Sequence, residues 1–176
     1  MAVKRKVKCK VTGEFGTSDV FFKNPDGPGY YKSKELYDEI RRQADARLEL
    51  VDILARDLLD YDEGQKFPPM LTRKLKELDF YSNVVILDTI KQCYDTLLQV
   101  KRTKEFSSTQ AWISYMFAII GNRIPDVYKE HKKREQEKER LDKKSKEFEQ
   151  LAEMINVANE SHQKQKTKDI SALLGE

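Results

Sequence analysis

The side chains that most often carry catalysis are few in this sequence. Nucleophilic catalysis needs a base within hydrogen-bond reach of the nucleophile, and that base is usually histidine. Both histidines, His131 and His162, fall in a stretch dominated by Lys, Arg and Glu, where nothing would exclude water. None of the seven glycines stands in a phosphate-binding pattern. We therefore expect a protein that is not an enzyme and that works by binding.

Metal and cofactor sites are also weakly indicated. The acidic cluster in residues 57–63 could hold a divalent cation, but its spacing matches no calcium loop. We interpret it as a solvated helix end. Of the two cysteines, Cys93 falls on the apolar face of a predicted helix and is interpreted as a small core hydrophobe. No cofactor is expected.

The second cysteine, Cys9, opens a segment with a recognisable pattern. Cys9-Lys10-Val11-Thr12-Gly13 precedes a turn-rich stretch, and Tyr30-Tyr31-Lys32-Ser33-Lys34-Glu35-Leu36-Tyr37 then enters a predicted helix. This arrangement resembles a zinc knuckle or treble-clef module, in which a C-x-x-C turn, a hairpin and a second ligand pair follow one another. Thr12 stands in place of the second cysteine, and Ser33 and Lys34 stand where later ligands would be expected.

One ligand of four therefore remains, and structural zinc needs four N or S ligands. We predict no metal. We expect the shape of the module to persist through aromatic side chains packed against the first helix: Phe15, Phe21, Tyr30 and Tyr31.

The same segment is a candidate nucleic-acid surface. Residues 1–34 carry a net charge of +5, whereas residues 35–129 carry −2 and residues 130–176 carry zero. Lysine contacts phosphate, and aromatic rings stack on bases. The candidate residues are Lys4, Arg5, Lys6, Lys8, Lys10, Lys32, Lys34, Tyr30 and Tyr31. The alternative is that the lysines keep an edge strand soluble.

The elements that must position these residues predict a mainly α fold. We expect a basic β-hairpin module at 1–34, a four-helix body at 35–125, a charged helix at 126–160 and a flexible tail at 161–176. Alternation at Val3, Val7, Cys9 and Val11 predicts the first strand. Val20-Phe21-Phe22 predicts the returning strand, and Tyr30-Tyr31 a short third one.

Caps and apolar spacing predict the helices of the body. Ser33 is the expected N-cap of a helix that runs to about residue 60, a short helix begins near Met70, and Ser82 or Asn83 caps the next. The fourth, from Thr109 to about Asn122, is apolar nearly all round and should be central to the core with Trp112. Pro125 should stop it or open a new helix. The stripe expected on the first helix is Leu36, Ile40, Ala44, Leu48, Val51, Ala55 and Leu58.

Two apolar groups interrupt the charged C-terminal region. Leu141, Phe148, Leu151, Ile155 and Ala158 follow at spacings of 7, 3, 4 and 3, as in a short coiled-coil seam. We predict that this seam binds a protein partner or makes a homo-oligomer; the alternatives are that it folds back on the body or is solvated. The partner-binding residues expected are Leu141, Phe148, Leu151, Ile155, Ile170, Leu173 and Leu174.

Part of the body resembles a known family. A short helix at Leu71–Phe80, the helix start Tyr81-Ser82-Asn83-Val84-Val85-Ile86 and the later Tyr115-x-x-x-Ile119-Ile120-x-Asn122 resemble the DnaD-like helical domain of replication-initiation proteins in Gram-positive bacteria and their phages. The match covers roughly residues 70–129, and the whole chain looks like small proteins encoded by such phages. The family's C-terminal DNA-binding motif is not clear here. The resemblance implies a replication-linked, non-enzymatic binding role.

These patterns lead to one expectation and its alternatives. No apolar run approaches the roughly 20 residues of a membrane span, and the basic N-terminus lacks a signal-peptide core, so we expect a cytoplasmic protein with no membrane partner. The leading expectation is a phage-type accessory protein that associates with DNA or a replication complex. The alternatives are a protein–protein interaction module, such as an inhibitor of a host or defence protein, and a virion or scaffolding component.

Overall fold

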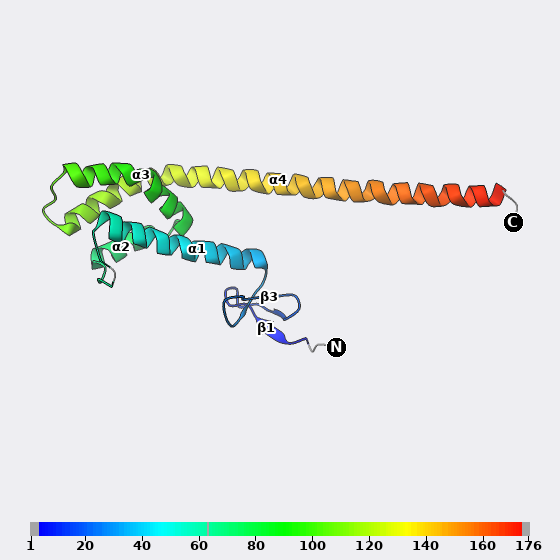
Figure 1. Ribbon diagram of the computed structural model, residues 1–176, viewed down its shortest axis with the longest axis horizontal. Helices are drawn as coiled ribbons and strands as arrows, with labels where there is room; N and C mark the ends of the chain where they lie inside the picture. Colours follow the sequence, from blue (N-terminus) through cyan, green and yellow to red (C-terminus); the bar gives the residue numbers. More distant parts are fainter. Residues whose placement is uncertain (1–3, 63, 174–176) are drawn as a thin grey trace. The chain divides into compact units, whose positions relative to one another are not determined.

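The computed structural model describes the backbone of residues 4–62 and 64–173, and side chains as far as residue 155. The elements are β1 (Lys6–Lys8), β2 (Phe15–Thr17), β3 (Phe22–Lys23), β4 (Tyr30–Tyr31), α1 (Lys34–Asp52), the π-helix η1 (Ile53–Leu58), α2 (Pro69–Glu77), α3 (Asn83–Thr103) and α4 (Thr109–Leu173) (Figure 1). The predicted mainly α fold with small N-terminal strands is confirmed. The chain divides into two compact units, Met1–Tyr128 and Lys129–Glu176.

The strands form two separate antiparallel pairs. β1 pairs with β2 and β3 pairs with β4. The predicted return of the first strand at Val20–Phe22 was wrong, because the chain already returns at β2. The turn between β1 and β2 closes early at Gly13, whose φ of +71° is a conformation that glycine adopts without strain. Phe22 pairs instead with Tyr31 of β4.

Side-chain caps start α1 and α3 as predicted, and a further cap starts α4. The Ser33 hydroxyl accepts a hydrogen bond from the Leu36 N–H at the start of α1, and the Ser82 hydroxyl accepts one from the Val85 N–H at the start of α3. At the start of α4 the Ser108 hydroxyl accepts one from the Ala111 N–H. Each cap satisfies one of the backbone donors that a helix leaves unpaired at its N-terminus.

The core of the body forms where α1 and η1 pack on α3, with α2 and the first turns of α4 completing it. Trp112 is 6% exposed, and its indole N–H donates to the Leu58 carbonyl at 2.8 Å, so the polar atom of the ring has a partner. Cys93 is buried in the same core, as predicted. The largest fully buried side chains include Leu50, Leu54, Ile86, Ile90, Ile113, Met116 and Ile120.

The apolar stripe predicted along α1 was wrong at Ala44, which is exposed, and at Leu48, which is 71% exposed. The buried residues of α1 are Ala46 and Leu50, two positions away in either direction. Two residues correspond to about 200° around a helix, so the face buried here lies nearly opposite Leu48. The reason is tertiary, because this face packs against α3.

The C-terminal end of α1 continues directly into η1. The wider turn places Leu54, Ala55 and Leu58 in the core together. The Tyr61 N–H donates to the Ala55 carbonyl at 2.9 Å, and Asp60 just before it has a φ of +55°. A left-handed residue of this kind commonly ends a helix.

Pro125 lies inside α4 and neither stops nor restarts it, contrary to the prediction. Proline removes the N–H that would bond to the carbonyl of Gly121. The turn is held by packing, since Ile124 is 2% exposed and Val127 is 1% exposed on either side of the proline.

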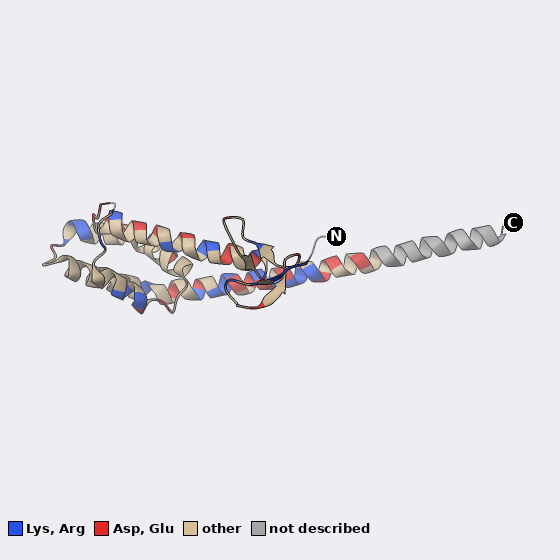
Figure 2. Ribbon diagram, turned by 90° about the horizontal axis from the view of Figure 1, so that it is seen from below, with Lys and Arg blue, Asp and Glu red and all other residues tan. Residues whose placement is uncertain are grey.

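The second unit, taken by itself, is the continuation of α4 from Lys129. Lysine, arginine, aspartate and glutamate alternate along its described part (Figure 2). The helix runs to Leu173, across the boundary at residue 161 where a flexible tail was expected. Within the residues that the structure describes, no helix is long and apolar enough to cross a membrane.

Candidate nucleic-acid interface

The hairpin of β1 and β2 brings two lysines and an aromatic ring onto one face. Side chains two residues apart on a strand share a face, and so do directly opposed residues on paired strands. Lys6 and Lys8 meet the first condition, and Lys8 lies opposite Phe15 in the register of the pair. The Lys6 Nζ lies 4.8 Å from the centre of the Phe15 ring and the Lys8 Nζ 5.7 Å from it. We call these three residues the Phe15 face.

The Phe15 ring is 63% exposed, so it was wrong to expect it to pack against the first helix. An exposed ring with two ammonium groups close to it offers a stacking surface for a base and two contacts for phosphate. The sequence pattern missed this residue because it placed Phe15 in a turn. The turn at Gly13, which fixes the register, was the signal that could have found it.

Cys9 connects the two strand pairs of the module. Its N–H donates to the Glu14 carbonyl at 2.8 Å, and a parallel bridge to Tyr30 joins the two strand pairs. The thiol is 1% exposed. Even so, a hydrogen bond from the Thr12 hydroxyl, helped by backbone N–H groups of neighbouring residues, lowers the pKa of Cys9 to about 7 against the opposing effect of burial. Thr12 stands where the zinc-knuckle pattern has its second cysteine, and its hydroxyl is hydrogen-bonded to Cys9.

Acidic neighbours pair with two of the predicted basic residues. The Lys4 ammonium lies 3.0 Å from the Asp19 carboxylate, and the Lys32 ammonium lies 2.9 Å from the Glu14 carboxylate. The Thr17 hydroxyl and then Lys4 lower the pKa of Asp19 to about 2. Hydrogen bonding to Glu14 raises the pKa of Lys32. These two lysines therefore add little net positive charge to the module.

The other predicted basic residues point into solvent. Arg5, Lys10 and Lys34 are exposed. The aliphatic stem of Lys10 crosses Gly29, where a Cβ atom would overlap it. Gly29 also has a φ of +119°, and this backbone conformation favours glycine there, whereas the exposed Lys10 side chain could move aside.

The two predicted tyrosines are half-buried and take part in holding the module. The Tyr31 ring meets the Tyr37 ring of α1 edge-on at 5.2 Å, and Phe22 lies 5.3 Å from the same ring. Asp26 accepts hydrogen bonds from the Tyr37 hydroxyl and the Arg41 guanidinium. The first of these bonds raises the pKa of Tyr37. Tyr37, which the sequence did not single out, anchors the module on α1.

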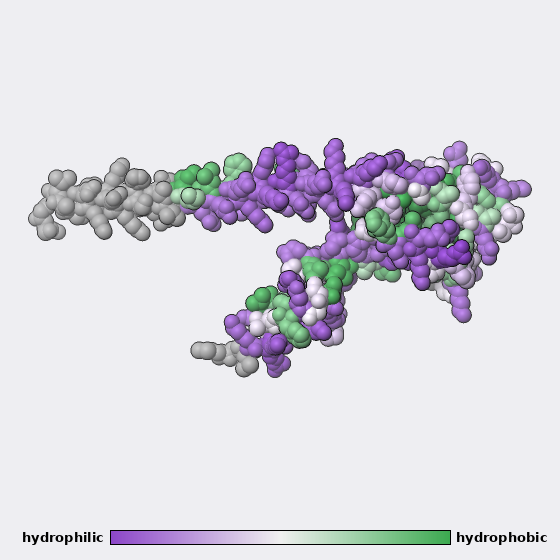
Figure 3. Space-filling view, turned by 180° about the vertical axis from the view of Figure 1, so that it is seen from behind, coloured by the Kyte–Doolittle hydropathy of each residue, from purple (hydrophilic) through white to green (hydrophobic). Residues whose placement is uncertain are grey.

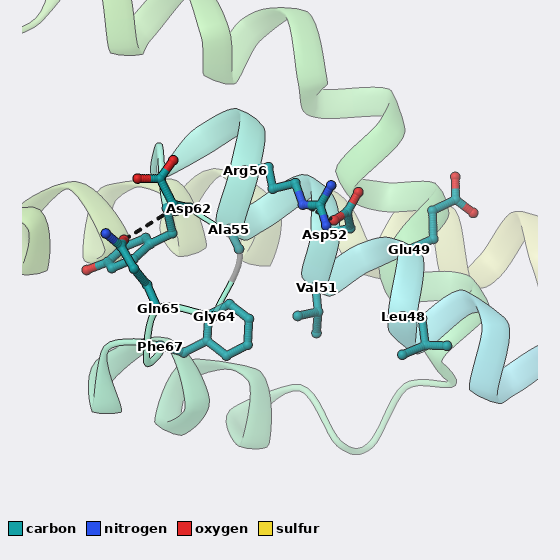
Figure 4. A pocket seen from close by; sticks show the side chains of 11 residues that line it. Leu48, Glu49, Val51, Asp52, Ala55, Arg56, Asp62, Gly64, Gln65 and Phe67 are labelled. Carbon is teal, nitrogen blue, oxygen red and sulfur yellow. Dashed lines mark hydrogen bonds and ion pairs between the residues drawn. The ribbon is translucent and has the colours of Figure 1, made fainter.

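A groove on the body is a second candidate site (Figure 4). It has a volume of about 470 Å³ and lies between the α1–η1 segment and the loop before α2. Leu48 and Phe67, which is 44% exposed, contribute apolar surface to it. Two ion pairs lie on its rim. The Glu49 carboxylate lies 2.6 Å from the Lys91 ammonium, and the Asp52 carboxylate lies 2.6 Å from the Arg56 guanidinium. The apolar lining consists of Leu48, Val51, Ala55, Tyr61 and Phe67.

Acidic side chains next to this groove are already paired with other side chains of the protein. The Tyr94 hydroxyl donates to the Asp57 carboxylate at 3.0 Å, and Lys101 lies 2.8 Å from the Asp60 carboxylate. Among the residues that the structure describes, no group of three or more His, Cys, Asp or Glu side chains could hold a metal ion.

The predicted partner-binding residues divide into two sets. Leu141, Phe148, Leu151 and Ile155 are exposed along α4, with exposed fractions between 53% and 70%. The other three, Ile170, Leu173 and Leu174, lie outside the residues whose side chains the structure describes.

Comparison with known proteins gives one family. The family model for the SPbeta prophage protein YorH matches residues 30–172. No curated protein and no solved structure matches the chain significantly. The match begins at Tyr30, so the Phe15 face lies outside it, whereas the body and most of α4 lie inside. Because the match spans most of the chain, the expectation of a phage-encoded protein is confirmed, and the chain belongs to the SPbeta prophage protein YorH family.

Proposed function

We propose that this chain is a non-enzymatic phage accessory protein that associates with nucleic acid, as DNA or as part of a replication complex, through the Phe15 face. The observation that carries the proposal is that Phe15 is 63% exposed and has the ammonium groups of both Lys6 and Lys8 within 6 Å of its ring centre. The resemblance of residues 70–129 to the DnaD-like domain supports a link to replication. Such a protein would act in the cytoplasm of a Gram-positive host.

The geometry of the hairpin suits a single strand better than a duplex. A base can stack on Phe15 only when it is not paired inside a helix, and stacking contributes roughly 1–3 kcal/mol per base. Lys6 and Lys8, which lie close to the ring, can then contact the phosphates that flank the stacked base. The turn that resembles a zinc knuckle supports this role, because backbone hydrogen bonds of Cys9 with Glu14 and Gly13 hold the end of β1 in place.

Fluorescence anisotropy with a labelled single strand and the matching duplex tests the proposal. Phe15→Ala should weaken single-strand binding by roughly 1–3 kcal/mol. Lys6→Gln with Lys8→Gln should flatten the slope of log affinity against log salt by up to about 0.7 per lost phosphate contact. The matched control is Val20→Ala, which removes another exposed apolar side chain of the module, 71% exposed, and should bind as the parent does. A parent protein that binds neither strand form at low salt would refute the proposal.

The groove favours a second candidate function, a protein–protein interaction module. This class includes an inhibitor of a host or defence protein and a virion or scaffolding component. The groove exposes Leu48 and Phe67 and lies inside the residues matched by the family model, whereas the Phe15 face does not. Co-purification from phage-infected cells should yield a defined protein with the parent chain and lose it with Leu48→Asp. Retention of the same protein by the variant would exclude the groove.

A further inference from the structure

Apolar side chains gather on one part of the charged C-terminal helix. In residues 129–155 the exposed large hydrophobics are Leu141 at 57%, Phe148 at 70%, Leu151 at 54%, Met154 at 70% and Ile155 at 53%. The space-filling view shows a hydrophobic patch on the helix beside the undescribed atoms, after a long hydrophilic stretch (Figure 3). We call Leu141, Phe148, Leu151 and Ile155 the C-terminal seam.

The spacing of the seam indicates that its occupant is another helix. Leu141, Phe148 and Ile155 follow at intervals of seven, and Leu151 lies between the last two. These are the a and d positions of a heptad, the repeat by which one helix packs its side chains into the holes of another.

The net charge of the helix favours a second copy of the same chain as the partner. Residues 130–155 contain eight basic and eight acidic side chains. A strongly basic or acidic partner would gain no net attraction here, whereas a second copy meets no net repulsion. Each copy also brings the same exposed apolar residues, so a pair removes two seams from water. We propose that two copies of this chain pair through their C-terminal seams as antiparallel helices.

Lys144 decides the orientation. It occupies the d position between Leu141 and Phe148. In a parallel pair in register, the two copies of Lys144 would face each other, which places like charges in contact. In an antiparallel pair centred between Phe148 and Leu151, Lys144 faces Ile155 of the second copy. Its aliphatic stem can then cover that side chain while the ammonium group reaches water.

Light scattering during gel filtration of the full chain tests the pairing. The parent should approach twice the chain mass of 20.7 kDa as concentration rises. Phe148→Ser with Leu151→Ser should raise the dissociation constant at least about tenfold, since these central residues pair with each other across the dimer. Lys146→Ser with Glu149→Ser, on the charged surface beside them, is the matched control and should dimerise as the parent does. Circular dichroism checks that each variant stays helical.

Disulfide cross-linking tests the orientation. Chains with Phe148→Cys mixed with chains with Leu151→Cys should cross-link to each other, because the antiparallel pair brings these positions together. Leu141→Cys, which leaves Lys144 in place, should not cross-link to itself, because the antiparallel pair holds the two copies of position 141 far apart. The parent is the background control, since Cys9 and Cys93 are buried. A monomeric parent at every concentration, or a double Ser variant that dimerises like the parent, overturns the pairing. Self-linked Leu141→Cys overturns the antiparallel arrangement. Binding at the Phe15 face is a separate property and is measured separately.

Discussion

The N-terminal module and the helical body keep their shape by different means. The body buries large side chains completely, for example Leu50, Ile90 and Ile113, each 0% exposed. In the described part of the module, residues 4–33, Cys9 is the one buried hydrophobic residue, at 1% exposed. The module relies on hydrogen bonds around Cys9 and on edge contacts between rings. A segment that does not need all its aromatic residues for a core can expose one for binding.

We expect the stability of the module to depend on the body, but not the stability of the body to depend on the module. Two-stranded pairs as short as β1–β2 and β3–β4 are not stable alone in water. They are held against α1 through Tyr37, whose ring contacts Phe22 and Tyr31. The core cluster of the body contains no residue from β1 to β4, so we expect the body to keep its fold without the module. Three substitutions can break or sharpen this contrast.

The largest effect is expected from Trp112→Ala. Removing a buried aromatic side chain should lower the free energy of unfolding by about 3–5 kcal/mol, and the Leu58 carbonyl also loses its partner. Denaturant unfolding followed by circular dichroism measures the change. Tyr115→Ala, on the same helix but 37% exposed, is the control and should cost clearly less. Equal losses for the two variants would mean that burial does not stabilise the body in the way described.

An intermediate and local effect is expected from Tyr37→Ala. The variant removes two ring contacts, each worth about 0.5–1.5 kcal/mol beyond area burial. Amide hydrogen exchange should show loss of protection at β1 to β4, with α3 unchanged. Tyr37→Phe keeps the ring and removes only the hydrogen bond to Asp26, so it should lose less protection. If α3 exchanged faster as well, the two regions would be mutually dependent.

The smallest effect concerns the protonation of Cys9. Its pKa is lowered from 9.0 to about 7 in the folded chain, so folding favours the thiolate. The resulting stabilisation is present in full above pH 9 and disappears as the pH falls through about 7. Thermal denaturation between these pH values should therefore show the parent gaining stability with pH relative to Cys9→Ser. Cys93 is present in both proteins, so its own titration cancels. Parallel curves would contradict the lowered pKa.

The features that the sequence predicted correctly depend on short-range chemistry. Ser33 and Ser82 cap helices because a hydroxyl oxygen needs only the N–H groups of the next turn. Trp112 is buried because its helix is apolar nearly all round. A helix of this kind buries most of its large side chains whichever way it faces the core.

The features that it missed depend on packing between distant segments. Leu48 is exposed because the opposite face of α1 meets α3, and spacing alone does not choose between two apolar faces. Pro125 continues a helix because Ile124 and Val127 anchor the turn in the core. The position of Phe15 on the candidate site followed from the register of a hairpin, which a single glycine conformation sets.

The hydrogen bond between Trp112 and Leu58 gives the molecule an optical reporter of its own. The chain has one tryptophan, and neither the Phe15 face nor the C-terminal seam contains it. Emission from this indole reports the environment where the end of η1 meets α4. Nucleic acid at Phe15 or a second copy at the seam would leave the emission wavelength unchanged, whereas opening of the body would shift it to the red. Unlabelled protein can therefore distinguish a variant that has lost a ligand from one that has lost its core.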